Sequence, residues 1–183
     1  MTEKKNVLAI VGSADKNSSN QNLVNRIEEL TRDNFNLTIF NSLSSLPHFN
    51  PELSIDKTPQ KILDFRELIL KADGIIICTP EYIFSIPSGL KNAIEWCVAT
   101  TIFSNKPVGL ITASASGQKG HEELQLIMKT IEAKFTEHTT LLIQGIKGKF
   151  DNKGNLTDPV TIEKLNYFLS QFEKLLEDKE IDL

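Results

Sequence analysis

Residues 12–20 hold the side chains best suited to bind a phosphate. Three serines and two asparagines follow a single glycine in this stretch. Hydroxyls, amides and free N–H groups at the start of a helix suit a phosphate monoester, so Ser13, Ser18 and Asn20 are the candidate donors. The stretch lacks the glycines of a dinucleotide fingerprint and the Gly-Lys-Ser/Thr of a P-loop. Taken alone, it also fits a solvated turn that caps the next helix.

Residues 79–87 have the composition of a stiff loop that could hold a flat ligand. Pro80 and Pro87 fix their own φ angles and restrict the residues before them, so the loop can be shaped before a ligand binds. Tyr82 and Phe84 supply aromatic surface. Without further information, the two rings fit contacts with a partner or with the core equally well.

Residues 113–120 are mostly small and permit a close approach of the backbone to a ring. Ser114, Ser116 and Gly117 are the candidates here, with a solvated turn as the alternative. Ser116 and His121 also raise the idea of a hydrolase. However, no nucleophile-elbow motif surrounds the serine and no acidic partner can be assigned, which argues against that chemistry.

The remaining groups with reactive side chains indicate no metal site. His48 and His138 are isolated in the sequence and are predicted to be loop or surface residues. Residues 151–155 predict a tight turn, because glycine stands fourth and not sixth, as a calcium loop requires. Cys78 and Cys97 lack zinc-ligand spacing and are predicted to be buried free thiols in a reducing compartment.

Composition excludes several classes of partner. The chain of 183 residues carries a net charge of −4, with 40% hydrophobic and 24% charged residues. This charge argues against a nucleic-acid partner and against an anionic membrane surface. Residues 1–5 lead into only five strongly apolar residues, too few for a secretory signal or a membrane span. We therefore expect one cytoplasmic domain covering residues 1–183.

Apolar runs and helical stripes alternate along the chain. Strands are predicted at 7–11, 37–40, 74–78, 107–112 and 139–143, with helical periodicity at 23–30, 58–72, 88–97, 124–135 and 158–176. Thr58-Pro59 and Asp158-Pro159 each predict a cap followed by proline at the first helical position. This alternation predicts a doubly wound α/β fold, a flavodoxin-like three-layer α/β/α sandwich with a five-stranded parallel sheet of order 2-1-3-4-5. In that order residues 12–20 and 79–87 meet at the topological switch point, with residues 113–120 as a third wall.

Two motifs at this predicted site resemble the NADPH-dependent FMN reductase family. They are Gly12-Ser13-x-x-x-x-Ser18-x-Asn20 and Pro80-Glu81-Tyr82-x-x-Ser85-x-Pro87-x-x-Leu90-Lys91-Asn92-Ala93-Ile94-Glu95-Trp96, and the resemblance covers roughly residues 7–135. It implies non-covalent FMN and an NAD(P)H oxidoreductase. Hydride would pass from NADPH or NADH to N5 of FMN, and then to a flavin, quinone, azo compound or similar small-molecule acceptor. The flavin would carry the chemistry, so no catalytic side chain is expected.

The resemblance also implies a set of cofactor-binding residues. Gly12, Ser13, Ser18 and Asn20 would lie at the phosphate. Pro80, Glu81, Tyr82 and Ile83 would line the ring, with backbone groups at its N5, O4 and N3 edge. Ser114, Ser116 and Gly117 would border the pyrimidine end, with Gln118 or Lys119 near N1 and O2.

One residue of the first loop departs from the family pattern. Asp15 stands where the family usually carries arginine, which removes a cation near the phosphate. Lys16 is a candidate replacement for that charge.

Assembly and function each have alternatives. The resemblance implies a homodimer or homotetramer, with the helix at 88–96 as a candidate interface, although Trp96 fits a half-buried core position equally well. A non-catalytic FMN-binding electron carrier or sensing module is the alternative function, and Asp15 also leaves open a scaffold that has lost FMN. The modest net charge and the open, proline-rich loop favour the reductase.

Overall fold

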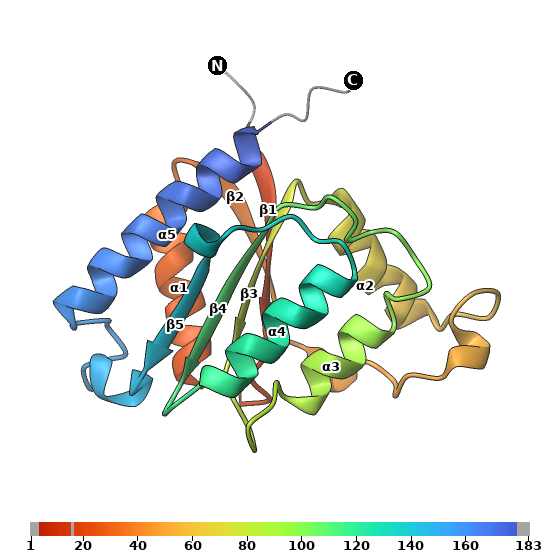
Figure 1. Ribbon diagram of the computed structural model, residues 1–183, viewed down its shortest axis with the longest axis horizontal. Coiled ribbons are helices and arrows are strands. Elements are labelled where there is room, and N and C mark those ends of the chain that lie inside the picture. The colour runs from red at the N-terminus through yellow and green to blue at the C-terminus, as the bar shows by residue number, and fades with distance from the viewer. Residues whose placement is uncertain (1–3, 16, 179–183) are drawn as a thin grey trace.

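The sheet has the predicted strand order. The computed structural model describes residues 4–15 and 17–178, and its strands are all parallel in the order β2-β1-β3-β4-β5 (Figure 1). Their bounds are β1 (Lys5–Val11), β2 (Phe35–Phe40), β3 (Gly74–Thr79), β4 (Val108–Ser114) and β5 (Thr140–Gln144). The sequence-based strands are therefore confirmed, with ends that differ by one or two residues. Ala113 and Ser114 belong to β4 and not to the following loop.

Five helices complete the three layers. They are α1 (Ser19–Thr31), α2 (Gln60–Lys71), α3 (Ser88–Glu95), α4 (Gln118–Thr130) and α5 (Pro159–Glu177). The helices α1 and α5 pack on one face of the sheet, and α2, α3 and α4 pack on the other (Figure 1). Within the described residues, no helix combines the length and apolar character needed to cross a bilayer.

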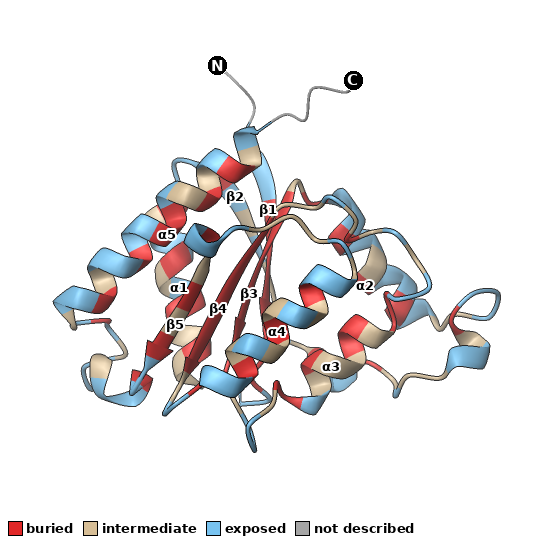
Figure 2. Cartoon of the chain, viewed as in Figure 1, coloured by how far each residue is buried: buried red, intermediate tan, exposed pale blue. Residues whose placement is uncertain are grey.

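The two faces of the sheet each contribute to a separate hydrophobic core. Along β3, Ile75 and Ile77 face the core made with α2, α3 and α4, whereas Ile76 and Cys78 face the core made with α1 and α5. Every residue of β3 is buried (Figure 2). A strand covered on both faces must be apolar at consecutive positions, which explains its unbroken isoleucine run.

The two proline-preceded helix starts differ. Asp158 caps α5 as predicted, because its carboxylate accepts the N–H of Thr161 at 2.9 Å and Pro159 is the first helical residue. The same prediction for Thr58 is wrong. The cap position of α2 is Pro59, in an extended conformation, and the Thr58 hydroxyl instead donates to the carbonyl of Leu53. A residue before proline is disfavoured in the helical region, and here the proline itself stays outside the helix.

Helix α4 is shorter than its hydrophobic periodicity indicates. It ends at Thr130, and the chain reverses at Glu132, whose φ is 62°. Lys134 then forms a parallel bridge beside Pro107, ahead of β4. The prediction that Phe135 lies in this helix is therefore wrong, although its ring still packs on the α2–α4 side of the sheet.

The long connection between β2 and α2 is irregular, and α3 holds it in place. It contains two short 3₁₀ turns, Leu43–Ser45 and Pro51–Leu53. The side chain of Asn92 accepts the N–H of Phe49 at 2.7 Å and donates to the carbonyl of Pro47 at 3.0 Å. The indole Nε1 of Trp96 donates to the same carbonyl at 2.8 Å. Trp96 is fully buried, so the core alternative for this residue is confirmed.

Residues 151–155, after β5, form the predicted tight turn. The Asp151 carboxylate accepts the N–H groups of Lys153 and Asn155, and Phe150 forms an antiparallel bridge with Leu156.

Candidate functional site

The carboxyl ends of the strands surround a cavity of about 760 Å³. Strand pairing brings these ends to one level, since Val11 pairs with Cys78 and Thr79 pairs with Thr112. Loops after β1, β3, β4 and β5 form the walls. The lining residues are Ser13, Asp15, Asn17, Ser18, Ser19, Asn20, Pro80, Tyr82, Ala113, Ser114, Ala115, Gly145, Ile146, Lys147 and Gly148. The predicted candidates Ser13, Ser18, Asn20, Pro80, Tyr82 and Ser114 are therefore brought together.

The start of α1 offers hydrogen-bond donors at one end of the cavity. Ser18 caps the helix, because its hydroxyl oxygen accepts the N–H of Gln21 at 3.2 Å. None of the hydrogen bonds between described residues uses the N–H groups of Ser19 and Asn20. These amides lie in the first turn, where the helix dipole favours an anion. This end of the cavity therefore suits a phosphate.

The Asn20 side chain joins the ends of two strands. It is buried, its Nδ2 donates to the carbonyl of Ala113 at 3.1 Å, and its Oδ1 accepts from the Cys78 thiol at 3.4 Å. Burial raises the pKa of Cys78, so the thiol stays protonated as a donor. One amide hydrogen of the Asn20 side chain is thus engaged in the wall, and none of the hydrogen bonds between described residues uses its backbone N–H.

A strained hairpin forms the opposite wall. The N–H of Tyr82 donates to the carbonyl of Ser85 at 2.9 Å, and the N–H of Ser85 donates back at 3.0 Å. The two tip residues, Ile83 and Phe84, have φ angles of 50° and 58°, which side-chain-bearing residues rarely adopt. Their exposed fractions are 95% and 76%, so the tip lies outside the cavity while Tyr82 lines it.

Two carboxylates attach this hairpin to α4. Glu81 extends from the hairpin to the start of the helix, where it accepts the N–H of Gly117 at 3.1 Å and the N–H of Gly120 at 2.8 Å. Glu123 extends from the helix to the hairpin, where it accepts the Ser85 hydroxyl at 2.6 Å and the N–H of Ile86 at 2.8 Å. The loop is therefore fixed to α4 at both of its ends.

Five of the predicted site residues do not line the cavity. They are Gly12, Glu81, Ile83, Ser116 and Gly117. A Cβ atom on Gly12 would lie 2.2 Å from Oγ1 of Thr79, so glycine is needed there for packing between β1 and β3. Gly117 precedes α4 with a φ of 85°, a conformation that glycine adopts without strain.

Ser116 and His121 do not form a catalytic pair. Ser116 is exposed, and Nδ1 of His121 instead lies 2.9 Å from the Thr112 hydroxyl. Burial lowers the pKa of His121 below its usual value, which favours the neutral ring. The geometry therefore gives no support to a hydrolase.

The segment after β5 is the part of the wall that the sequence-based site omitted. Residues 145–148 line the cavity, and the N–H of Gly145 donates to the carbonyl of Ala115 at 3.1 Å. The rule that ligands bind beyond strand carboxyl ends applies to β5 as well and was the available signal. Lys147 is exposed in this segment and is the cation among the described lining residues, whereas Asp15 is the acid. Lys16, the other candidate cation, lies outside the described residues.

A smaller cavity of about 300 Å³ lies against Tyr82 as well. Its walls include Leu43, Leu46 and His48 from the connection that Asn92 holds, together with Ser88 and Gly89 at the start of α3. His48 is exposed, as predicted for a loop histidine. Tyr82 therefore borders both cavities.

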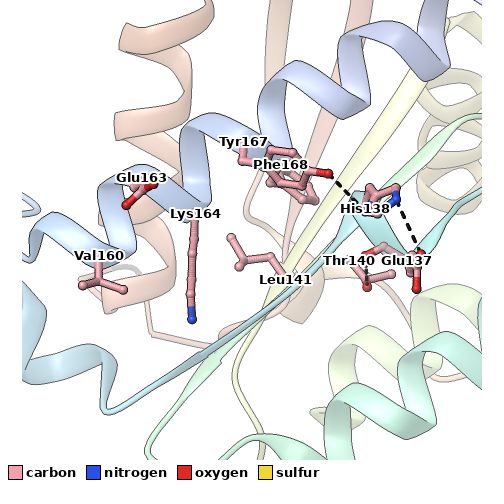
Figure 3. A pocket seen from close by; sticks show the side chains of 9 residues that line it. All are labelled: Glu137, His138, Thr140, Leu141, Val160, Glu163, Lys164, Tyr167 and Phe168. Atoms are coloured by element: carbon pink, nitrogen blue, oxygen red, sulfur yellow. Dashed lines mark hydrogen bonds and ion pairs between the residues drawn. The ribbon is translucent and has the colours of Figure 1, made fainter.

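A third cavity, of about 380 Å³, lies at the amino end of β5 beside α5 (Figure 3). There the Tyr167 hydroxyl lies 3.2 Å from Nδ1 of His138, and Nε2 of that ring lies 3.5 Å from a Glu137 carboxylate oxygen. His138 is exposed, as predicted. Ligands of doubly wound sheets bind at the opposite, carboxyl end of the strands, so this cavity is not the candidate site. Within residues 4–15 and 17–178, no group of three potential metal ligands comes together.

Comparison with known proteins gives consistent results. The family model described as NADPH-dependent FMN reductase matches residues 5–146. The chain is 32% identical over 171 residues to an NADPH:quinone oxidoreductase of Arabidopsis thaliana, covering 89% of this chain and 87% of that protein. It is 30% identical over 186 residues to subunit 2 of an NADH-dependent flavin reductase of Lactobacillus johnsonii, covering 95% and 98%.

A solved structure shares both the fold and part of the sequence. It is the flavoenzyme NAD(P)H:acceptor oxidoreductase of Paracoccus denitrificans, with a TM-score of 0.80 and 26% identity. The match covers 94% of this chain and 97% of the other.

Proposed function

The chain belongs to the NADPH-dependent FMN reductase family, and on this basis we propose that it is an FMN-dependent NAD(P)H oxidoreductase that reduces flavin or quinone acceptors. The observation that carries the proposal is the cavity at the switch point, with N–H donors of α1 that no described residue engages at one end and the stiff hairpin at the other. FMN has a phosphate at one end and a flat ring at the other. One end of the cavity offers hydrogen-bond donors that suit an anion, and the other end offers a wall of fixed shape that suits a ring.

The residues at the α1 end fit a phosphate. Ser13, Ser18 and the N–H groups of Ser19 and Asn20 are donors at a helix start, and no acidic group other than Asp15 lines the cavity within the described residues. The Asp15 carboxylate accepts the N–H of Asn17 at 2.9 Å, which engages it within its own loop. Lys147, on the wall formed by the loop after β5, supplies the cation that the first loop lacks.

The residues at the hairpin end fit a flat ring. Pro80 and Tyr82 line the cavity, whereas Glu81 and Ile83 belong to the hairpin that holds Tyr82 in place. Gly12 keeps β1 and β3 close enough for the first two loops to meet. Ser114 borders the ring from β4, and Ser116 and Gly117 shape the turn behind it.

When bound, FMN accepts a hydride from the nicotinamide and passes it to the acceptor. The chain binds and orients the reactants, and no side chain in the cavity is needed as an acid, base or nucleophile. Orientation alone can contribute several kcal/mol to a rate. The two attachments to α4 keep the hairpin wall in one position, which serves this purpose. NADH or NADPH acts as the reductant.

The visible spectrum of the purified protein, with and without added FMN, tests the cofactor. We expect flavin absorption bands that remain with the protein on gel filtration, and their loss under anaerobic addition of NADH or NADPH. A protein that retains no FMN would overturn the cofactor assignment. If FMN binds and neither nicotinamide bleaches it, the chain is an electron carrier or sensing module and not a reductase.

We also propose a cytoplasmic homodimer or homotetramer. Both cysteines are free and buried, which suits a reducing compartment. The exposed apolar tip of the hairpin, Ile83 and Phe84, gives a surface that a second subunit can cover. Light scattering coupled to size exclusion tests the assembly, and a monomer at micromolar concentration would contradict it.

A further inference from the structure

Carboxylates bind several of the donor groups at the start of α4. The N–H groups of Gly117 and Gly120 donate to Glu81, as described above. Between these two glycines in the sequence, the Lys119 ammonium pairs with the Glu122 carboxylate at 2.7 Å. The side-chain amide of Gln118 donates to the same glutamate at 3.3 Å. The positive end of a helix dipole is strongest at these first amides, and a carboxylate placed on them offsets it.

The start of α4 is close to the candidate cofactor cavity. Ser114 and Ala115 line the cavity, and Gly117 follows two residues later as the residue that precedes the helix. The Ser114 hydroxyl also donates to the backbone carbonyl of Glu81 at 3.4 Å. The Glu81 carboxylate therefore sits between the hairpin wall and the β4 wall, where its charge acts on whatever the cavity holds.

The carboxylate position is fixed by packing. A Cβ atom on Gly120 would lie 3.2 Å from Cβ and 3.3 Å from Cγ of Glu81, so residue 120 leaves space for the glutamate side chain. Glu123 supports the same hairpin from the other direction, and its carboxylate accepts hydrogen bonds from Ser85 and Ile86. The two glutamates share a mechanical role, and only Glu81 places its charge on the start of the helix.

We propose that Glu81 is a positioning residue whose charge cancels the positive end of α4, so that the pocket does not favour the reduced cofactor. Two-electron reduction makes the flavin ring more negative, and a bare helix start beside it would stabilise that form. With Glu81 in place, the bound flavin remains a strong reductant toward its acceptor. This inference rests on the proposed FMN-dependent function and assigns a role to Glu81 that is separate from ring contact.

A pair of isosteric substitutions separates charge from mechanical support. Glu81→Gln removes the charge on the helix start, whereas Glu123→Gln weakens the same loop without changing that charge. The readouts are the dissociation constant of oxidised FMN, from fluorescence titration, and the midpoint potentials of bound and of free FMN. The difference between the two potentials gives the ratio of affinities for reduced and oxidised FMN, and the titration shows that binding itself is retained. We expect this ratio to rise roughly two- to fivefold in Glu81→Gln, from the strength of a helix dipole, and to stay unchanged in Glu123→Gln.

Wild-type protein that binds no FMN would refute the proposed function itself. If the wild type binds FMN, an unchanged ratio in Glu81→Gln overturns the inference, and so does an equal rise in Glu123→Gln. Should Glu81→Gln fail to fold, the shorter pair Glu81→Asp and Glu81→Asn decides the question, because these two variants have side chains of the same size and differ in charge. A higher ratio in Glu81→Asn than in Glu81→Asp supports the inference, and equal ratios overturn it.

Discussion

The two ends of the candidate cofactor cavity are built in opposite ways. At the hairpin end, the loop after β3 uses its backbone in a hairpin and is attached to α4 by Glu81 and Glu123. At the helix end, the loop after β1 is held mainly by contacts within itself, and no hydrogen bond between described residues uses the N–H groups of Ser19 and Asn20. A flat ring gains from a wall of fixed shape, whereas a phosphate gains from donors that are not already paired.

Asn20 is the exception at the helix end, and its substitution should have the largest effect. In Asn20→Ala, the buried carbonyl of Ala113 loses the Asn20 donor, which should lower the free energy of unfolding by about 2 to 3 kcal/mol. FMN affinity should fall too, because the first loop loses its anchor to β4. Urea denaturation and fluorescence titration measure the two effects. Asn25→Ala is the matched control, since Asn25 is exposed on α1 and does not line the cavity. Equal losses in Asn20→Ala and Asn25→Ala would contradict the anchoring role of Asn20.

The strain at the hairpin tip gives a second way to test the difference between the rigid hairpin end and the helix end of the cavity. Replacing Ile83 and Phe84 by Asn and Gly provides the residues that tolerate positive φ in a two-residue hairpin. Both native side chains are exposed, so little packing is lost. The unfolding free energy should rise by about 2 kcal/mol. Ile83→Ala leaves the strain in place and should give no such gain. A loss of stability in the Asn-Gly variant would show that the tip is not strained.

Ser18→Ala tests the cap and the phosphate donor together. Loss of the helix cap should cost about 1 kcal/mol of stability. Loss of a hydroxyl donor to an anion should weaken FMN binding about tenfold. Denaturation and titration distinguish the two contributions. Ser170→Ala, on the exposed face of α5, is the control. Unchanged FMN affinity in Ser18→Ala would remove this residue from the phosphate site.

Lys147 should contribute a smaller, salt-dependent amount to the same end of the cavity. Lys147→Gln should weaken FMN binding about threefold at low ionic strength, with the difference shrinking as salt is added. Lys153→Gln is the control, because Lys153 lies in the turn after β5 and away from the cavity. A salt-independent change in Lys147→Gln would indicate a structural effect and not a charge effect.

The smallest expected effect is a pH dependence at the hairpin end. Burial lowers the pKa of His121 in the folded protein below its ordinary value of about 6.5. The unfolded chain therefore binds the proton more readily, and stability is fully present above about pH 6.5 and is lost as the pH falls toward the folded pKa. His121→Gln should reduce this dependence in denaturation curves recorded between pH 5 and pH 8. An identical pH dependence in the variant would exclude His121 as its source.

Local sequence signals predicted most of the fold because they report on burial and on chain stiffness. The isoleucine run of β3 and the Asp158-Pro159 start of α5 are examples. Predictions failed where tertiary contacts overruled the pattern. The periodicity of α4 continues to Phe135, but the chain turns at Glu132 so that Lys134 can pair beside Pro107. Thr58 had a cap-like position, yet its hydroxyl donates to Leu53.

The sequence by itself determined the order of strands, the switch point and the two loops that meet there. Apolar runs and helical periods follow from solvent exclusion, which acts residue by residue, and parallel crossovers leave few topologies. Only the tertiary structure decided how each side chain is used. Glu81 turns to the amides of α4, Asn20 ties Ala113 to Cys78, and Lys147 joins the cavity from the loop after β5. These roles depend on partners that are far away in the sequence, and the sequence pattern does not give the distance in space between two such residues.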